Sequence, residues 1–502
     1  MSTQCAPKLA AVAIPTGHLL HSAASEHAAQ TLLLSQARRL RLGRQVGAEA
    51  HAWTASARAT GTLSLCEAIL EAFGLGTPEG KAFMRLAEAL LRTRDRATAW
   101  KLLCENLRSA HWEAPLTAHR GARALAAVLQ WMSRAVLSHE ARLAPLSTLF
   151  VAAARFGVAL AAKQFIVADN ISQALRRMRR DPALRLCSID CLGESARTEA
   201  QAQRYFRAYE HVIEVLAREP AAPLHLRHGI SIKLSALEPR FGPRYRGTYH
   251  ARLIPQVLHL AQRAAAAGIG LTIDAEEQDR LESTLDVMAA LIDDPTTRSW
   301  AGLGLAVQAY GLRAPHVITW LADRARARER RMTVRLVKGA YWDSEIKRAQ
   351  ERGLDAFPVF TEKCATDVSY LVCAHRLFEQ QNVIFPQFAT HNAMTVAAVR
   401  AIAPPGAAYE FQRLHGMGEQ LYRTASQSAG FPPVRAYAPV GSREDLLAYL
   451  IRRLLENGAN SSFVRHFLDP SMPIATLLEN PIDVLSERLQ RRDANRCHIA
   501  HS

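Results

Sequence analysis

Charged side chains lie inside two short apolar runs, where a β-strand would bury them. Lys233 is flanked by Ile232 and Leu234, and Arg335 occupies the middle of the run 332–338. A buried cation needs a partner, so both positions indicate contacts with a ligand. Polar residues also follow most of the other apolar runs, and the full set is Asp190, Glu194, Lys233, Asp274, Gln308, Arg335, Lys338, Thr390, His391, Asn392, His415 and Tyr437.

A second group of candidate residues lies on the apolar stretch LLAYLIRRLLENGANSSF, which is predicted to be a helix. Tyr449, Arg452 and Arg453 are spaced by three and four residues, so they share one helix face. Two adjacent guanidinium groups can hold a small carboxylate through bidentate hydrogen bonds, and phosphate is the other candidate. A basic end that stabilises the helix dipole is the structural alternative.

Several classes of catalytic chemistry lack their motifs. His391 and His415 have no serine or cysteine nucleophile motif beside them, and there is no HExxH, Cys/His ligand run or P-loop. Residues 274–277 could bind Mg²⁺ in isolation, but no second strand end is rich in carboxylates, so no metal is predicted. A cofactor remains as the source of the chemistry. Arg335, Lys338 and Trp342 suit a flavin, with cations for the reduced ring and the diphosphate.

The elements that would position these residues follow a repeating pattern. Eight short apolar runs occupy residues 184–190, 229–235, 270–275, 303–309, 332–338, 382–388, 408–414 and 434–440. Amphipathic helical stretches follow most of them, at 200–217, 249–267, 278–291, 314–328 and 446–456. This pattern predicts an α/β fold, a (βα)8 TIM-type barrel with its site at the carboxyl ends of the strands. A doubly wound sheet is the rival, but GxGxxG does not follow the first strand.

The regions outside the barrel are predicted as three units. Residues 1–60 lack sustained periodicity and are expected to form a short helix and a variable basic arm. Residues 61–180 show helical spacing, for example at Trp100, Leu103 and Leu107, and predict an all-helical domain. The barrel would span 181–470, followed by a charged tail at 471–502.

Composition agrees with a folded enzyme. Of 502 residues, 49% are hydrophobic and 22% charged, far from the composition of disordered chains. The formal charge of +16 favours anionic partners such as nucleic acid or lipid headgroups. Eight dispersed cysteines, none at CxxC spacing, predict reduced thiols in a cytoplasmic protein, and no stretch is predicted to span a membrane.

Long strings spread through the chain resemble one family. TVRLVKGAYWDSEIKRAQERG, ISIKLSALEPRF, LTIDAEEQDRLE, FPQFATHN, YEFQRLHGMGE and YAPVG look like the proline dehydrogenase domain of bacterial proline utilization A (PutA) flavoproteins. The resemblance runs from about residue 77 to residue 469. It implies an FAD-dependent barrel that oxidises L-proline to 1-pyrroline-5-carboxylate and passes electrons to a membrane quinone, the first step of proline catabolism to glutamate.

The resemblance also implies a role for each site residue. Arg335, Lys233, Asp274 and Tyr437 would form the catalytic centre. Substrate would contact Lys233, Asp274, Tyr341, Leu414, Tyr437, Tyr449, Arg452 and Arg453, with Glu194 pairing an arginine of the closing helix. FAD would contact Gln308, Arg335 (near N5), Lys338 (at the pyrophosphate), Gly339, Trp342, Thr390, His391, Asn392 and Glu456.

The sequence departs from the family pattern in two respects. Met394 stands where the family usually has histidine in HNAHT, a change expected to alter packing. The aldehyde dehydrogenase half of PutA has no room before Ser502, which predicts a stand-alone protein or one piece of a split PutA, with a separate 1-pyrroline-5-carboxylate dehydrogenase as a possible partner.

The functional prediction is therefore a cytoplasmic proline dehydrogenase that associates reversibly with the inner membrane. Two alternatives stay open. One is a DNA-binding, proline-responsive regulator of the PutA type, supported only by the charge and by the basic cluster in residues 38–44; specific DNA is not the expected partner. The other is an inactive flavin-binding remnant of a split PutA.

Overall fold

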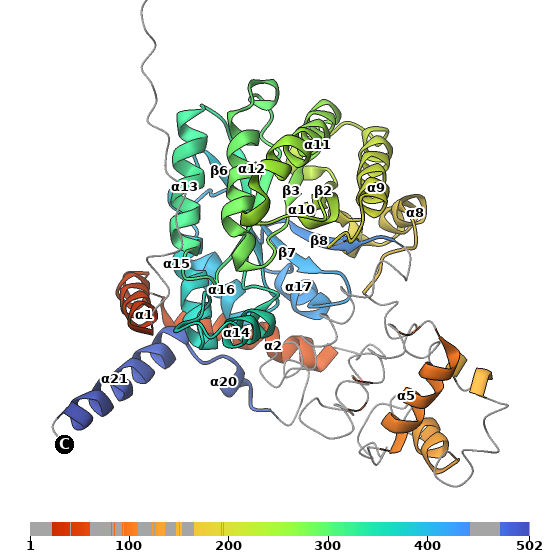
Figure 1. Ribbon diagram of the computed structural model, residues 1–502. Coiled ribbons are helices and arrows are strands. Elements are labelled where there is room, and N and C mark those ends of the chain that lie inside the picture. Colours follow the sequence, from red (N-terminus) through yellow and green to blue (C-terminus); the bar gives the residue numbers. More distant parts are fainter. Residues whose placement is uncertain are drawn as a thin grey trace, which may run out of the picture.

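A closed barrel of eight parallel strands forms the centre of the molecule in the computed structural model (Figure 1). The strands pair in chain order, and β8 closes onto β1. Each of the eight predicted apolar runs holds one strand, so the TIM-type barrel is confirmed. The strands are β1 Cys187–Asp190, β2 Gly229–Ile232, β3 Leu271–Ile273, β4 Leu303–Gln308, β5 Met332–Val337, β6 Ile384–Ala389, β7 Glu410–Leu414 and β8 Val434–Pro439.

The structure describes most of the barrel and parts of the flanking regions. The described residues are 23–40, 42–60, 82, 85, 93, 95–108, 123, 127–135, 147–149, 151–152, 165–191, 193, 195–441 and 472–500. Their α-helices are α1 Ala23–Arg38, α2 Arg44–Thr60, α5 Arg96–Arg108, α8 Ile171–Arg180, α9 Glu199–Ala217, α10 Leu234–Leu237, α11 Arg246–Ala267, α12 Leu281–Asp293, α13 Ala314–Ala327, α14 Trp342–Glu351, α15 Lys363–Glu379, α16 Ala393–Ile402, α17 Glu419–Ala425, α20 Ile474–Leu477 and α21 Pro481–Ala500. Among these helices, none combines the length and the apolar character that crossing a membrane requires.

The strands separate apolar and polar side chains onto opposite faces. Val334 and Leu336 of β5 pack in the core shared with the surrounding helices, whereas Arg335 between them bonds to side chains of other strands. This follows from the alternation of side chains along a strand. The interior of a TIM barrel usually holds branched aliphatic residues. Here it carries charges and hydrogen-bonding groups, so the barrel axis is itself a candidate for chemistry.

The helix α11 illustrates how the sequence builds the outer layer. Its buried residues Tyr249, Leu253, Val257, Leu260 and Ala264 recur every three or four positions, which gives one apolar stripe toward the strands. The helix ends at Gly268, whose φ of 63° lies in the left-handed region that favours glycine. The same apolar stripe made several of the barrel helices predictable from the sequence.

The amino-terminal prediction of one short helix and a loose basic arm is wrong for the described part of that segment. Residues 23–60 form two helices of 16 and 17 residues, and α2 packs on α16 and α17. Trp53 is 4% exposed; its indole nitrogen donates to Ser428 Oγ at 3.1 Å and its ring meets Phe431 edge-on. The buried face of α2 includes Ala50 and Ala57, but alanines also cover its other faces, so the sequence shows no clear apolar period.

The carboxyl-terminal tail is also part of the packed structure. Leu485 and Leu489 of α21 share a small core with Leu33 and Leu34 of α1 and with residues of α15. In Figure 1, α1 and α21 lie beside the lower end of α15, far apart in sequence but adjacent in space. Both terminal helices therefore contact the segment that leads into α15.

Little of the predicted helical domain 61–180 is described. The helix α5 lies to one side of the barrel in Figure 1, and Trp100, Leu103 and Leu107 are buried in it at the spacing that predicted a helix. Phe83, Leu86, Leu90 and Leu91, which carried the same prediction, lie outside the described residues.

Replacing Trp53 tests whether α2 belongs to the barrel's cooperative unit. Trp53→Ala should lower the free energy of unfolding by about 3–5 kcal/mol, because it removes a large buried ring and leaves a cavity. Leu32→Ala is the control: Leu32 is 54% exposed on α1, so the change should be within about 0.5 kcal/mol. Urea denaturation followed by circular dichroism measures both. A loss below about 1 kcal/mol for Trp53→Ala would show that α2 unfolds separately.

Candidate functional site

Four charged side chains meet at the carboxyl end of the barrel, and Lys233 lies at their centre. Its Nζ donates to Asp190 Oδ2 at 3.1 Å and to Asp274 Oδ2 at 3.0 Å. The third partner is the Tyr437 hydroxyl, at 3.1 Å. An ammonium group has three N–H donors, so every donor of Lys233 is used, by residues from β1, β8 and the end of β3.

Arg335 of β5 lies beside this lysine and is held from four directions. Its Nη1 donates to Asp274 Oδ1 at 2.7 Å, and its Nε donates to Gln412 Oε1 at 2.6 Å. Its Nη2 donates to the hydroxyls of Ser188 and Ser231, each at 2.9 Å. Arg335 is 3% exposed. These partners come from β1, β2, β7 and the end of β3, so barrel closure itself orients the guanidinium.

Asp274 joins the two cations. One carboxylate oxygen accepts from Arg335, and the other accepts from Lys233 and from the Tyr437 hydroxyl, the last at 2.5 Å. Burial alone would raise the pKa of Asp274, but the charges of Lys233 and Arg335 outweigh it and hold that pKa below its usual value. Asp274 therefore stays ionised and keeps both cations in place.

Asp190 and Tyr437 complete the cluster. Burial raises the pKa of Asp190, an effect that the charge of Lys233 offsets only in part, and Asp190 Oδ1 has no hydrogen-bond partner among the described residues. The ring of Tyr437 lies 5.3 Å from the Arg335 guanidinium and 5.8 Å from Lys233 Nζ, within the range of cation–π attraction. With both carboxylates ionised, the two cations and two anions balance, so an anionic substrate would require further positive charge.

The turn after β5 carries features that suit a diphosphate. Lys338 and Lys363 both pair with Asp367, which leaves one cation in excess. Gly339 has φ of 137°, and a Cβ there would lie 2.5 Å from the Tyr310 ring, so only glycine lets the backbone pass. Excess positive charge beside a glycine backbone is an arrangement that binds phosphate groups.

Trp342 begins α14 just beyond this turn. Its indole nitrogen donates to the Phe360 carbonyl at 2.8 Å, and 40% of the residue is exposed. A partly exposed aromatic ring that is fixed at one edge can pack on a planar cofactor. Tyr341, immediately before it, is half-buried.

The loop after β6 is tightly constrained. Thr390 Oγ1 accepts from the Asn392 backbone at 3.2 Å, and the Asn392 side chain caps α16 by accepting from Thr395 N at 3.0 Å. His391 Nε2 accepts from the Leu414 backbone N–H at 3.0 Å, which joins this loop to the end of β7. The three predicted residues of this loop and Leu414 therefore lie together, around the rim rather than in the Lys233 cluster.

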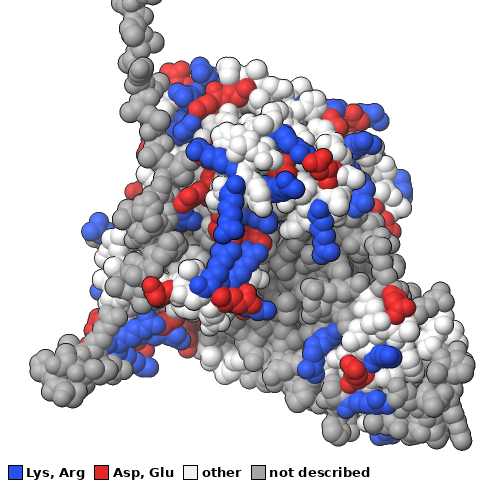
Figure 2. All heavy atoms as spheres, in the orientation of Figure 1, with Lys and Arg blue, Asp and Glu red and all other residues white. Residues whose placement is uncertain are grey.

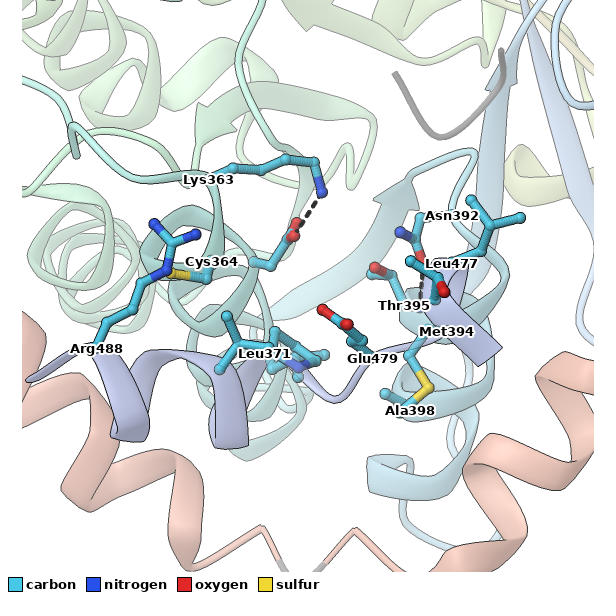
Figure 3. A pocket seen from close by; sticks show the side chains of 14 residues that line it. Lys363, Cys364, Leu371, Asn392, Met394, Thr395, Ala398, Leu477, Glu479 and Arg488 are labelled. Atoms are coloured by element: carbon cyan, nitrogen blue, oxygen red, sulfur yellow. Dashed lines mark hydrogen bonds and ion pairs between the residues drawn. The ribbon is translucent and has the colours of Figure 1, made fainter. Parts of the chain in front are cut away.

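A cavity of about 200 Å³ opens next to this loop, between α15, α16 and the α20–α21 segment (Figure 3). Asn392, Lys363 and Asp367 line it, and Glu479 and Arg488 face it from the carboxyl-terminal segment. Met394, at the position where the resemblance leads us to expect histidine, also lines the cavity and is 8% exposed. Its side chain is therefore part of the cavity wall.

Gln308 connects the end of β4 to the backbone of two neighbouring loops. Its Nε2 donates to the Glu276 carbonyl at 2.7 Å, and its Oε1 accepts from the Ala340 backbone at 3.4 Å.

Two buried carboxyl groups near the barrel rim have raised pKa values. Burial raises the pKa of Glu276 to about 7, and it likewise raises the pKa of Glu345, on α14, to about 7. The carboxylate of Glu345 accepts from the Gln278 backbone N–H at 2.7 Å, so it fastens α14 to the loop that follows β3.

Some predicted residues lie elsewhere or cannot be placed. His415 directly follows β7 and is buried, and burial and the nearby charges of Arg177 and Arg413 lower its pKa to about 3. It makes no hydrogen bond to the Lys233 cluster among the described residues. Glu194, Tyr449, Arg452, Arg453 and Glu456 lie outside the described residues.

Sequence reasoning missed several members of the buried network. Ser188, Ser231 and Gln412 hold Arg335, yet none was a candidate. Their signal was present, since each is a polar residue at an inward position of an apolar run. In the part of the chain that the structure describes, no group of three or more His, Cys, Asp or Glu is arranged to hold a metal ion.

Comparison with known proteins places these features in a family. Residues 171–466 match the model described as "Proline dehydrogenase" and residues 65–178 the model described as "DNA-binding domain of Proline dehydrogenase". The chain is 42% identical over 456 residues to the bifunctional protein PutA of Salmonella typhimurium, which covers 86% of this chain and 34% of that protein. It is 27% identical to proline dehydrogenase 1 of Bacillus subtilis, over 63% of this chain and 93% of that protein.

Among solved structures, a mutant of Bradyrhizobium japonicum proline utilization A (PutA) aligns with a TM-score of 0.73 and 41% identity. The alignment covers 94% of this chain and 49% of that one. The chain spans about a third of the length of the curated PutA relatives that it matches.

The raised pKa of Glu345 predicts a pH-dependent stability. The unfolded carboxyl group ionises near pH 4.5 and the folded one near pH 7, so between these values the folded state holds more protons and stability falls as pH rises. Glu345→Gln cannot ionise and should lose less stability than the wild type between pH 5 and pH 8, by up to about 3 kcal/mol at 1.4 kcal/mol per unit. Urea denaturation at both pH values measures the difference, and equal losses in both proteins would contradict the assignment.

Proposed function

The chain belongs to the proline dehydrogenase family, and from that premise we propose that it oxidises L-proline to 1-pyrroline-5-carboxylate with bound FAD. The observation that carries the proposal is the pair of buried cations, Lys233 and Arg335, joined by Asp274 at the carboxyl end of the barrel. Active sites of TIM barrels lie at this end.

The geometry supports a flavin site. Oxidising the C–N bond of proline to C=N removes two electrons, and FAD supplies a two-electron acceptor when bound. Arg335 is fixed by four hydrogen-bond partners, so its charge can stabilise an anionic reduced ring without reorganising. Beyond Arg335 along the chain come Lys338, Gly339 and Trp342. With Arg335 at the flavin ring, this order fits a diphosphate at Lys338. The barrel rim near these residues carries further proposed flavin contacts, namely Gln308, Thr390, His391 and Asn392. Glu456 is proposed from family resemblance alone.

Binding of the proline carboxylate requires a change in the hydrogen bonds of the Lys233 cluster. All three donors of Lys233 are used by protein acceptors, so binding a proline carboxylate requires one of these bonds to be exchanged. With both carboxylates ionised, the charge of the cluster is balanced and gives no net attraction for an anion. Arg452 and Arg453, outside the described residues, are the proposed source of that charge, with Tyr341, Leu414, Tyr437 and Tyr449 around the ring and Glu194 pairing one of the arginines.

We further propose that the electrons pass to a membrane quinone. The protein would be cytoplasmic and would bind the inner membrane reversibly. A 1-pyrroline-5-carboxylate dehydrogenase would then use the product, as the next step toward glutamate. The net charge of +16 supports attraction to anionic lipid. Figure 2 shows basic and acidic side chains interspersed over the visible face, so the described part of that face does not present one continuous basic area.

DNA binding is the second candidate function. The description of the model matched by residues 65–178 is the observation that favours it. Salt-sensitive binding to a specific DNA sequence, measured on protein whose flavin content is known, separates this function from the first.

The central experiment is reduction of the flavin by proline. Purified protein should carry flavin, and its absorbance should bleach when L-proline is added without oxygen. Arg335→Met should lower the flavin's reduction potential and slow bleaching at least tenfold, because a charged hydrogen bond is worth about 1.5–3 kcal/mol. Arg413→Met is the matched control: Arg413 is equally buried but points outward to Glu419 and the Ala183 carbonyl. Absence of flavin, or an unchanged potential in Arg335→Met, would refute the assignment.

Membrane association is tested by co-sedimentation with anionic vesicles. Binding should weaken between low and high salt, because each basic residue near the surface contributes about 1 kcal/mol through a screened attraction. Proline-reduced protein should be compared with oxidised protein in both salts, with neutral vesicles as the control. Protein that remains in the supernatant in every condition while still reducing a soluble quinone would contradict membrane association.

A further inference from the structure

A second polar layer lies inside the barrel below Arg335, and among the described residues Gln412 is hydrogen-bonded to both this layer and Arg335. Gln412 Oε1 accepts from Arg335 Nε at 2.6 Å, and Gln412 Nε2 donates to Glu410 Oε1 at 2.7 Å. Both residues belong to β7 and are 1% exposed. Gln412 is therefore the link between the layer that holds Glu410 and the guanidinium above it.

Glu410 is anchored by a buried arginine. Arg435 Nε donates to Glu410 Oε1 at 2.7 Å, and Arg435 Nη2 donates to Glu410 Oε2 at 3.0 Å. The remaining donors of Arg435 go to the backbone carbonyls of Cys187, Arg227 and His225. All five donors of the guanidinium are used, so Arg435 is fixed and holds Glu410 in one position.

This anchoring determines which way the Gln412 amide faces. An amide has a donor end and an acceptor end of nearly equal size. The carboxylate of Glu410 can only accept, so it selects the –NH₂ end, and the carbonyl oxygen is turned toward Arg335. With the amide reversed, its –NH₂ group would face the N–H of Arg335, and its oxygen would face the carboxylate.

We propose that Gln412 is a positioning residue for Arg335, with its orientation set by the Glu410–Arg435 pair. The proposal rests on the proposed function, in which Arg335 acts on the flavin. Gln412 and Asp274 contact different nitrogens of the guanidinium, Nε and Nη1, and two contacts at different atoms fix its plane. Loss of the Nε contact leaves a buried donor unpaired, so the guanidinium can shift toward its remaining partners, Asp274 at Nη1 and the two serine hydroxyls at Nη2.

The barrel supplies a matched control in Gln387. This residue of β6 donates from Nε2 to the same Glu410 oxygen at 2.9 Å and is 7% exposed. Its Oε1 has no hydrogen-bond partner among the described residues. Gln387 therefore resembles Gln412 in residue type, layer and acceptor. It is the register partner of Arg335 on the neighbouring strand, but among the described residues it makes no hydrogen bond to Arg335.

The test compares Gln412→Leu with Gln387→Leu in protein loaded with flavin. Gln412→Leu should slow the bleaching of the flavin by proline roughly tenfold and lower the flavin's reduction potential, in the same direction as Arg335→Met but by less. Gln387→Leu should stay within about twofold of wild type in rate, with its potential unchanged. Equal effects of the two leucine variants, or no effect of Gln412→Leu, would overturn the proposal.

A double variant separates positioning from general damage to the barrel. If Gln412 acts through Arg335, adding Gln412→Leu to Arg335→Met should change the potential no further, whereas independent effects would add. The Arg335→Met variant alone also separates the flavin role of Arg335 from the positioning role of Gln412. An unchanged potential in Arg335→Met refutes the proposed flavin role, whereas a shifted potential there with none in Gln412→Leu refutes only the positioning role.

Discussion

The carboxylate of Asp274 is the interaction on which the rest of the site depends. It bonds to Lys233 and Arg335 with different oxygens, so neither cation is left unpaired inside the barrel. Removing one partner of a buried ion pair leaves an uncompensated charge, which is strongly destabilising. The two cations that the proposed chemistry requires can therefore lie close together only because this carboxylate is between them.

The same constraint explains the polar interior of the barrel. Once Lys233 and Arg335 occupy inward positions, their hydrogen-bonding needs must be met by other inward positions, and small hydroxyl residues do so at Ser188 and Ser231. Below them, Glu410 and Arg435 form a second balanced pair. Apolar packing is moved to the outer faces of the strands, where Val334 and Leu336 meet the helices. The fold is stable because its apolar core is the layer between strands and helices.

The terminal helices extend this organisation to the rim. Glu26 of α1 accepts from the backbone and the hydroxyl of Thr361, and Arg492 of α21 pairs with Glu362. Phe360, the preceding residue, holds the indole of Trp342. Segments at both ends of the described chain thus stabilise the loop beneath a proposed flavin contact, which the sequence prediction of a loose arm and a simple tail did not foresee.

The sequence by itself determined the barrel, the order of its strands and the presence of cations at inward positions. These are local properties: an apolar run with a helical stretch after it predicts a βα unit, and a lysine or arginine inside the run marks a buried charge. Only the tertiary structure decided which groups meet. The partners of Arg335 come from residues 188, 231, 274 and 412, and no periodicity relates positions so far apart. The packing of α2 was not predicted for a related reason. Alanines lie on several of its faces, so only the contacts with α16 and α17 show which face is buried. Contacts made by barrel closure depend on register and distance in space, which a pattern along the chain does not encode.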